Sequence, residues 1–460
     1  MSEFTDFRTK MESAGVSEAA ILAFKHCYTS LLDDTPTVIR EDEITAIDKL
    51  VELESLTNVG STFSEDILNQ TVMIKLNGGL GTGMGLQKPK SLLNIGSGMT
   101  FLDVIVEQVE YLKSSVGSSV RFLLMNSFST SESTLKHLED FSDVEQVELL
   151  QNQIPKVNAE TLKPVEYAKN PDLEWCPPGH GDLYAALTGK GKLDELLSEG
   201  VKYAFVSNAD NLGAMLDPVI LNYFVQSDKP FLMEVTRRTE SDKKGGHLAL
   251  RKEDSQMLLR EVAQTDEEDI KEFQNIDKHQ YFNTNNLWIR LDKLKELLDR
   301  FDGVVPLPMI KNKKTVDPRD SSSTPVFQLE IAMGAAISCF EGADAICVPR
   351  SRFAPVKATS DLMALRSDAY MKTDEGQIVL LPEREGIPPV IKLSKDYKLV
   401  DALEGLGSPS LKAVKSLTIS GLVRFAENVV LKGEVTFTNH TEEVKWIASG
   451  MYENEAVEFN

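Results

Sequence analysis

The sequence has little cysteine and no long apolar run. It contains four cysteines in 460 residues, Cys27, Cys176, Cys339 and Cys347, and none of them forms a CxxC pair. This excludes a disulfide-built scaffold, so we expect reduced thiols. No stretch of about 18 apolar residues marks a membrane span, and the opening MSEFTDFRTK lacks the apolar core of a signal peptide. We therefore expect a cytoplasmic protein without a membrane partner.

Basic residues are scarce relative to acidic ones. The chain has 49 Lys and Arg against 71 Asp and Glu, a formal net charge of −22 at pH 7. Such a surface repels nucleic-acid phosphates, so we expect no nucleic-acid partner. A site for an anionic phosphate would need backbone N–H groups, a few chosen lysines and metal ions.

Three segments follow from the pattern of apolar residues. Residues 1–65 are predicted to form an N-terminal helical segment, because apolar residues recur at helical spacing within 19–32 and 44–56. Residues 66–390 alternate strand-length apolar runs with helix-length amphipathic stretches. This alternation predicts an α/β catalytic domain whose mostly parallel sheet has helices on both faces, with ligands beyond the carboxyl ends of the strands.

Residues 391–460 contain apolar pairs that recur every six residues. The pairs are Leu417/Ile419, Val423/Phe425, Val429/Leu431 and Val435/Phe437. An unbroken period of six favours a small parallel β-helix over two antiparallel hairpins, although Gly421 and Gly433 would suit turns in either. Because an end coil of a β-helix exposes strand edges, this segment is our candidate surface for a homo-oligomer.

A glycine-rich loop follows the strand-like residues 72–76. Five glycines stand at positions 78, 79, 81, 83 and 85, and Lys90 comes after Pro89. Glycines let the backbone approach a ligand closely, and successive N–H groups can then converge on phosphate oxygens. Leu86 after Gly85 excludes a Walker A loop, and the spacing excludes the dinucleotide pattern GxGxxG. The alternative is a tight turn with a solvated lysine, which so many glycines disfavour.

Further polar loops follow other apolar strands. His180 lies between two glycines after two prolines, a setting that suits substrate contact as well as a structural role. Residues 203–207 lead to Asn208, which can donate and accept, and to Asp210, which offers a hard oxygen ligand to Mg²⁺ on phosphates. Taken alone, an Asx turn explains these last two residues. Lys357, near two arginines, is a candidate for phosphate charge.

Six motifs, taken in order, resemble the eukaryotic-type UTP–glucose-1-phosphate uridylyltransferase (UDP-glucose pyrophosphorylase) family. They are KLNGGLGTGMGLQKPKS, PPGHGDLY, VSNADNLGA, FLMEVTRRTESDKKGGHL, FNTNNLWI and VPRSRFAPVK. The stretches RRTESDKKGGHL and RSDAY are most similar to the trypanosomatid branch. The resemblance implies a Rossmann-like catalytic domain followed by a left-handed parallel β-helix, which agrees with the two patterns above.

The resemblance also implies roles for individual residues. Lys90, Asp210 and Lys357 would be catalytic, and Asp210 would hold a Mg²⁺ cofactor. The nucleotide would contact Leu76, Asn77, Gly78, Gly79, Lys90, Gln153, Gly179 and Asp210. The sugar would contact His180, Asn208, Gly246, Glu261, Phe282 and Asn283.

The expected reaction converts UTP and glucose 1-phosphate into UDP-glucose and pyrophosphate. Its nucleophile is already an anion, so it requires positive groups aimed at the phosphates rather than a general base. The alternatives are a broad-specificity UDP-sugar pyrophosphorylase and a non-catalytic nucleotide-sugar sensor, which would not need Lys90, Asp210 and Lys357 together. An N-acetylhexosamine enzyme is disfavoured, because Gly83 stands where that family's loop has an arginine.

Overall fold

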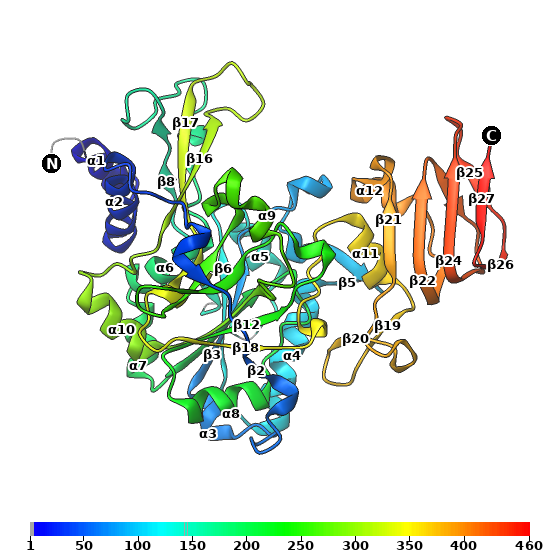
Figure 1. Ribbon diagram of the computed structural model, residues 1–460, viewed down its shortest axis with the longest axis horizontal. Helices are drawn as coiled ribbons and strands as arrows, with labels where there is room; N and C mark the ends of the chain where they lie inside the picture. Colours follow the sequence, from blue (N-terminus) through cyan, green and yellow to red (C-terminus); the bar gives the residue numbers. More distant parts are fainter. Residues whose placement is uncertain (1–3, 142, 145) are drawn as a thin grey trace. The chain divides into compact units, whose positions relative to one another are not determined.

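The computed structural model describes residues 4–141, 143–144 and 146–460, and the chain divides into two compact units (Figure 1). Unit 1 comprises Met1–Gly78, Val116–Asn208 and Leu216–Arg350. Unit 2 comprises Gly79–Ser115, Ala209–Met215 and Ser351–Asn460.

Within the described part of the chain, no helix is long and apolar enough to cross a membrane.

These units do not coincide with the predicted division at residues 65 and 390. Each unit gathers segments that lie far apart in the sequence, and the short segment Ala209–Met215 belongs to unit 2 although the residues on either side of it belong to unit 1. Local sequence patterns show where the type of secondary structure changes, but they do not reveal units that are assembled by long-range contacts.

Unit 1 is built on a mixed sheet whose main path is β2–β18–β12–β15–β11–β3–β6–β7. β15 runs antiparallel to β11 and β12, and the other neighbours on this path are parallel. The predicted α/β class with a mixed central sheet is confirmed. The bounds are β2 (Val51–Glu52), β3 (Thr71–Asn77), β6 (Arg121–Asn126), β7 (Glu148–Leu150), β11 (Tyr203–Asn208), β12 (Phe231–Arg237), β15 (Tyr281–Arg290) and β18 (Asp344–Cys347).

Buried polar side chains cross the middle of this sheet. Lys75 of β3 donates to Ser207 Oγ of β11 at 2.8 Å. Glu234 of β12 accepts from Asn286 Nδ2 at 3.0 Å and from the Trp288 indole N–H at 2.9 Å, both on β15. Because a buried charge is costly unless it is hydrogen-bonded, these bonds link β3 to β11 and β12 to β15 within the sheet.

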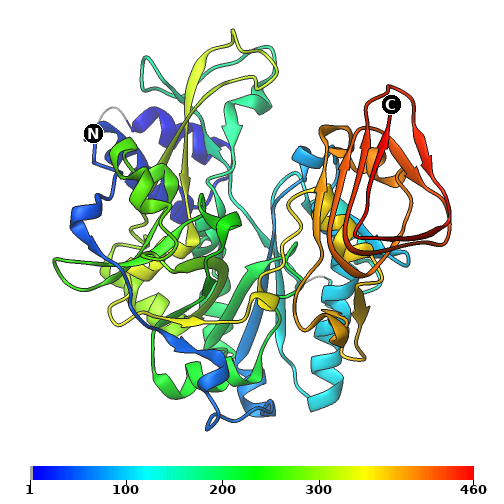
Figure 2. The same cartoon turned by 45° about the vertical axis from the view of Figure 1, so that its right-hand side comes forward.

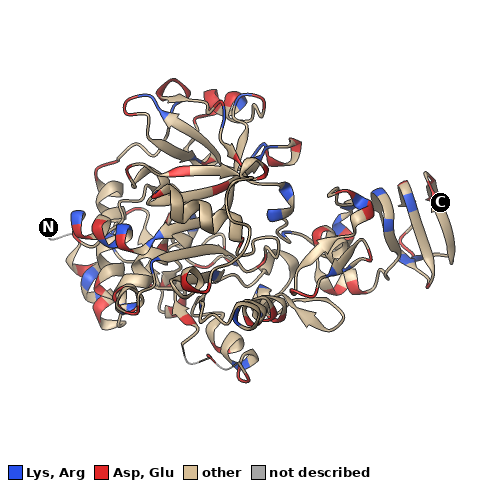
Figure 3. Ribbon diagram, turned by 90° about the horizontal axis from the view of Figure 1, so that it is seen from below, with Lys and Arg blue, Asp and Glu red and all other residues tan. Residues whose placement is uncertain are grey.

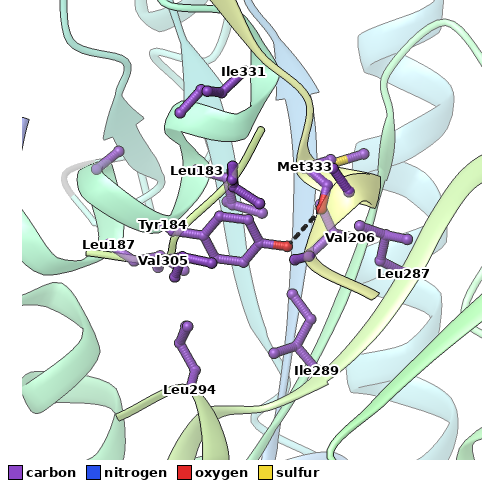
Figure 4. Close-up of a cluster of buried hydrophobic side chains, with 14 of the residues drawn as sticks. Leu183, Tyr184, Leu187, Val206, Leu287, Ile289, Leu294, Val305, Ile331 and Met333 are labelled. Carbon is purple, nitrogen blue, oxygen red and sulfur yellow. Dashed lines mark hydrogen bonds between the residues drawn. The ribbon is translucent and has the colours of Figure 1, made fainter. Parts of the chain in front are cut away.

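A cluster of buried apolar side chains gathers residues of several elements of unit 1 (Figure 4). Helix α6 (Leu183–Gly189) places Leu183, Tyr184 and Leu187 beside Val206 of β11. Full burial of such aliphatic side chains stabilises the fold by about 1.5–3 kcal/mol each. The Tyr184 hydroxyl donates to the Met333 carbonyl at 2.9 Å, which ties the start of α6 to a distant segment.

Further elements complete unit 1. Leucines at helical spacing bury one face of α10 (Leu291–Arg300), which contacts α7 (Lys192–Ser198). The other bounds are α3 (Glu65–Asn69), α5 (Ser131–His137), α8 (Pro218–Ser227), α9 (Ile270–Phe273), β8 (Ile154–Pro155), β9 (Val157–Asn158), β10 (Trp175–Cys176), β13 (His247–Arg251), β14 (Met257–Arg260), β16 (Met309–Thr315) and β17 (Pro325–Ile331).

The N-terminal segment is helical only in its first half. Helices α1 (Thr5–Ser13) and α2 (Glu18–Leu32) agree with the prediction. The helix expected over residues 44–56 is wrong, because this stretch contains the strands β1 (Ile44–Thr45) and β2. Ile44 pairs with Arg251 of β13, and Val51 pairs with Ile346 of β18. Pairing with existing sheet edges overrides the weak helical propensity of the sequence.

Unit 2 ends in a coil of parallel strands (Figures 1 and 2). β21 (Val390–Leu393), β22 (Ser410–Ser420), β24 (Val429–Asn439) and β26 (Gly450–Glu453) stack in that order. β27 (Ala456–Phe459) also pairs with β24, and β23 (Val423–Phe425) pairs with β25 (Lys445–Ile447). All these pairings are parallel, which rules out the hairpin alternative.

The period of six marks the inside of this coil. All eight residues of the four apolar pairs are buried. Gly421 has φ +79°, and a Cβ there would lie 2.2 Å from the Asn439 carbonyl oxygen, so the corner requires glycine. The other bounds in unit 2 are α4 (Phe101–Val116), which ends one residue inside unit 1, β4 (Asn94–Gly96), β5 (Met99–Thr100), α11 (Thr359–Arg366), β19 (Tyr370–Lys372), β20 (Ile378–Leu380) and α12 (Val400–Glu404).

Candidate functional site

Two predicted residues meet at the carboxyl ends of neighbouring strands in unit 1. Leu76 of β3 is the register partner of Asn208 of β11, and both are half-buried. The next residue, Asn77, is buried and donates its side-chain amide to Asn126 Oδ1 at 2.7 Å and to Thr134 Oγ1 at 3.0 Å. The Asn77 amide N–H groups therefore fix the end of β3.

A glutamine bridges two of the predicted nucleotide contacts. A Cβ on Gly78 would lie 3.0 Å from Gln151 Oε1, and Gln151 Nε2 donates to the Gly179 carbonyl at 2.9 Å. Gln151 therefore joins the loop after β3 to the loop before His180. Among the described residues, the structure does not bring Gln153 into these contacts, and the uracil role given to Gln153 stays a prediction.

His180 is held as a neutral imidazole. The Met333 backbone N–H donates to His180 Nδ1 at 3.0 Å, which places the ring proton on Nε2. Burial lowers the pKa of His180 to about 4. The ring is therefore uncharged near neutral pH and offers Nε2–H as a donor.

The loop around His180 is packed tightly against the end of β17. Gly179 has φ +81°, and a Cβ there would lie 2.5 Å from the Ile331 carbonyl oxygen. The buried Asp182 accepts from the Asn152 backbone N–H at 2.7 Å and from Asn152 Nδ2 at 3.1 Å. Burial raises the pKa of Asp182 to about 7, against the lowering effect of these bonds.

The four other predicted sugar residues of unit 1 come together from the start of β13, the end of β14 and from β15. A Cβ on Gly246 would lie 2.5 Å from a Glu261 carboxylate oxygen, and the Gly246 carbonyl accepts from the Asn283 N–H at 3.3 Å. The Phe282 ring covers the preceding turn, where a Cβ on Gly245 would lie 2.0 Å from it. Close approach of backbone and side chains therefore explains both glycines.

Sequence reasoning missed the segment that joins His180 to this sugar set. Met333 binds His180, and a Cβ on the next residue, Gly334, would lie 3.1 Å from Asn283 Nδ2. The segment lies in FQLEIAMGAA, whose composition is that of a buried strand and turn. The only feature of the sequence that pointed to this segment was a glycine after a strand-like run.

Unit 2 contains the predicted phosphate residues. Lys and Arg residues are interspersed with Asp and Glu along the ribbon (Figure 3), so positive charge must come from individual side chains. Lys90 Nζ lies 2.6 Å from Asp210 Oδ2, with side-chain exposures of 17% and 23%. The Lys90 backbone N–H donates to the Gly79 carbonyl at 3.0 Å, which closes the glycine loop. The structure thus places the two predicted catalytic charges side by side.

The segment around Asp210 is bound to the segment that contains Lys357. The Val356 N–H donates to the Asp210 carbonyl at 3.2 Å, and the Asn211 side chain accepts from the Ala354 N–H at 3.0 Å. Lys357 is exposed, with Nζ 5.4 Å from the centre of the Phe353 ring. Lys357 therefore directly follows Val356, the residue whose backbone contacts Asp210.

A preformed metal cage is absent from the described residues, since no group of three or more His, Cys, Asp or Glu could hold an ion. Mg²⁺ on a nucleotide keeps several waters and takes one or two carboxylates plus phosphate oxygens, and the Mg²⁺ role given to Asp210 stays a prediction. The Asp210 carboxylate is partly exposed, as a carboxylate that shares a metal ion with a nucleotide must be.

Comparisons with known proteins show which family the chain resembles. The family model described as UTP--glucose-1-phosphate uridylyltransferase matches residues 21–432. The UTP--glucose-1-phosphate uridylyltransferase of Hordeum vulgare is 44% identical over 376 residues, 80% of this chain and 77% of the relative.

Solved structures match over the whole chain. A point mutant of UDP-glucose pyrophosphorylase from Leishmania major, in complex with UDP-glucose, has a TM-score of 0.94 and 45% identity, covering 99% of each chain. The UDP-glucose phosphorylase from Trypanosoma brucei has a TM-score of 0.90 and 46% identity, covering 100% of each chain. The chain belongs to the UTP–glucose-1-phosphate uridylyltransferase family.

Proposed function

We propose that this chain joins UTP and glucose 1-phosphate into UDP-glucose and pyrophosphate through the residues described above. The observation that carries the assignment of residues is the Lys90–Asp210 pair, at 2.6 Å directly after a glycine loop. A cation and a carboxylate beside a backbone anion nest are the groups that phosphoryl chemistry requires.

The reaction balances without a proton carrier. An oxygen of glucose 1-phosphate forms a bond to the α-phosphorus of UTP, and the bond from that phosphorus to the α–β bridging oxygen breaks in line. Pyrophosphate leaves with the bonding electrons. Because one phosphoanhydride bond replaces another, the reaction is readily reversible.

The lysines act on the charge that repels the two reactants. We expect Lys90 to release Asp210 and turn to the phosphates when UTP binds, while Lys357 binds phosphate during transfer. Positive groups aimed at developing charge lower such barriers by about 3–4 kcal/mol each. Asp210, once released, would hold Mg²⁺, which supplies further neutralisation of phosphate charge when bound.

Backbone groups and side chains other than the two lysines and Asp210 orient the organic parts of the substrates. We assign the loop backbone at Leu76, Gly78 and Gly79 to the nucleotide, with Gly179 and either Gln151 or Gln153 at the uracil. Gln151 is the stronger candidate because it already joins Gly78 to Gly179. The sugar is assigned to a separate set: His180, Asn208, Gly246, Glu261, Phe282 and Asn283.

Pyrophosphate release from UTP with a panel of sugar 1-phosphates tests this function. We expect release with glucose 1-phosphate in the presence of Mg²⁺, and its loss on adding a chelator. Equal turnover of galactose 1-phosphate would indicate the broad-specificity enzyme. Binding of UDP-glucose without any release would indicate the sensor.

We also propose that the terminal coil is left-handed and that it forms homo-oligomers. β26 and β27 pair with β24 at one end of the stack, and Met451 of β26 and Trp446 of β25 are 65% and 62% exposed. Light scattering should give a mass above one chain, and the double variant Trp446→Glu/Met451→Glu should reduce it. A single-chain mass for the unaltered protein would end this proposal.

A cytoplasmic location is likewise our proposal. It is supported by the four cysteines, all of which are free thiols. Fluorescence microscopy of a tagged full chain tests it.

A further inference from the structure

A buried group of charged and imidazole side chains lies next to the predicted sugar set of unit 1. We call it the back cluster, and its members are Glu41, His247, Arg260, Asp269 and His279. Arg260, His247 and His279 are almost completely buried. Glu41 comes from the N-terminal segment, far in sequence from the other members.

The Glu41 carboxylate is the centre of the back cluster. One oxygen accepts from Arg260 at 2.5 Å. The other accepts from His279 Nε2 at 2.9 Å and lies 2.8 Å from Lys278 Nζ. Arg260 also donates to Asp269 at 3.0 Å, and the Glu41 backbone N–H donates to the same Asp269 oxygen at 2.7 Å. Glu41 therefore connects Arg260 to His279 and Lys278.

The back cluster is attached directly to the strands that present the sugar set. His247 is the register partner of Arg260 on β14 and of Phe282 on β15. The His247 and His279 rings stack with centroids 3.9 Å apart. Along the chain, His247 follows Gly246 and Arg260 precedes Glu261. A shift of either buried side chain therefore moves a neighbouring sugar residue.

A second buried arginine fixes the turn before Gly246. Arg238 donates to the carbonyls of Asp242 at 3.2 Å, Lys243 at 2.9 Å and Gly245 at 3.4 Å. The Gly246 side of the sugar set is thus held by Arg238, and the Glu261 side depends on Arg260. Since a buried guanidinium is stable only with its partners in place, the position of Arg260 depends on Glu41.

We infer that Glu41 is a positioning residue for the sugar. Its carboxylate sets the place of Arg260 and His279, and through them the gap between Gly246 and Glu261. Gly246 and the Glu261 carboxylate are in close contact, so a displacement of Arg260 alters their spacing. The inference rests on the proposed assignment of Gly246, Glu261, Phe282 and Asn283 to the sugar.

The test compares substrates that share the nucleotide but differ in the sugar. Glu41→Gln retains the shape of the side chain, but it places an amide N–H donor among the donors of Arg260, His279 and Lys278. We expect KM for glucose 1-phosphate to rise about tenfold, with KM for UTP unchanged. In calorimetry, affinity for UDP-glucose should fall by the same factor and affinity for UDP should not change. Glu41→Asp, which keeps the charge, should restore part of the loss.

Asp42→Asn is the matched control, because it removes one negative charge from the neighbouring residue, whose side chain is 77% exposed. This variant should behave as the unaltered chain. A purely structural role for Glu41 would lower the melting temperature and weaken UDP and UDP-glucose binding alike, which would overturn the inference. Because calorimetry needs no turnover, the inference is decided separately from pyrophosphate release, which tests the proposed function.

Discussion

The predicted residues of unit 1 and those of unit 2 are prepared for binding in different ways. In unit 1, the predicted residues His180 and Asn283 are neutral and have hydrogen bonds to neighbouring protein groups, and so does Gln151, which the sequence did not indicate. In unit 2, Lys90 and Asp210 are charged, partly exposed and bonded to each other. We expect the first set to keep its contacts when a ligand binds, and the second to exchange its partners.

This difference follows from the chemistry of the ligand parts. A uracil or sugar is recognised by protein dipoles whose positions are fixed before binding. The entropy cost of ordering these dipoles is therefore met during folding. Phosphates carry the charge that changes during the reaction, and groups aimed at it contribute to rate. In a chain of net charge −22, an unpaired lysine would attract surrounding carboxylates, and its pairing with Asp210 also holds it near the glycine loop.

The largest effects should come from removing charge in unit 2. Lys90→Ala and Lys357→Ala should each lower kcat by about a hundredfold or more, with the fold retained, because each removes a positive group from the phosphates. Steady-state pyrophosphate release measures this. Lys88→Ala is the control, since Lys88 is exposed in the same loop. Near-normal turnover in either variant would remove that lysine from the mechanism.

The glycine loop offers a test of close ligand approach. A Cβ on Gly79 meets no atom within 4 Å, so Gly79→Ala should leave the melting temperature unchanged. If UTP contacts the loop backbone there, KM for UTP should rise about tenfold because the methyl group excludes the phosphate. Gly83→Ala, which also meets nothing within 4 Å, is the control in the same loop. Equal kinetics for both variants would place the phosphates elsewhere.

A smaller effect should separate the two glutamines. Gln151→Ala breaks the bridge between Gly78 and Gly179 and should weaken UDP binding by about fivefold to tenfold, the cost of one buried hydrogen bond. Gln153→Ala should have little effect. Calorimetry with UDP measures both, and the reverse order would restore the role that the family resemblance gives to Gln153.

The smallest predicted effect concerns the protonation of Asp182, which lies in the loop that contains His180. The pKa of Asp182, raised by burial to about 7, lies above its unfolded value, so the folded chain binds the proton more tightly between about pH 4 and 7. This contribution to stability is present at low pH and lost as the pH rises towards 7. Relative to Asp182→Asn, the unaltered chain should gain about 2–4 °C in melting temperature between pH 7 and pH 5. A constant difference across this range would mean that Asp182 is ionised throughout.

Local patterns in the sequence predicted the sheet and the terminal coil. β3, β6, β11 and β12 lie where apolar runs precede polar loops, and the period of six marks the interior of the coil. Both signals depend on side-chain alternation along a few consecutive residues, which needs no knowledge of distant partners. The order and residue types of the six motifs were specific enough to indicate the family.

Non-local contacts decided the rest. Residues 44–45 and 51–52 became short strands because β13 and β18 offered them partners. The family resemblance selected Gln153, whereas the fold brings Gln151 to Gly78. Met333 and Gly334 had no polar or charged signal at all.

The sequence by itself determined the reaction class, the α/β architecture and the glycine loop with Lys90. These depend on residue types in short, ordered motifs. Only the tertiary structure decided that Lys90 pairs with Asp210, that Met333 sets the tautomer of His180, and that Glu41 stands beside the sugar set. Each of these contacts joins residues more than a hundred positions apart, and only folding brings such residues within bonding distance.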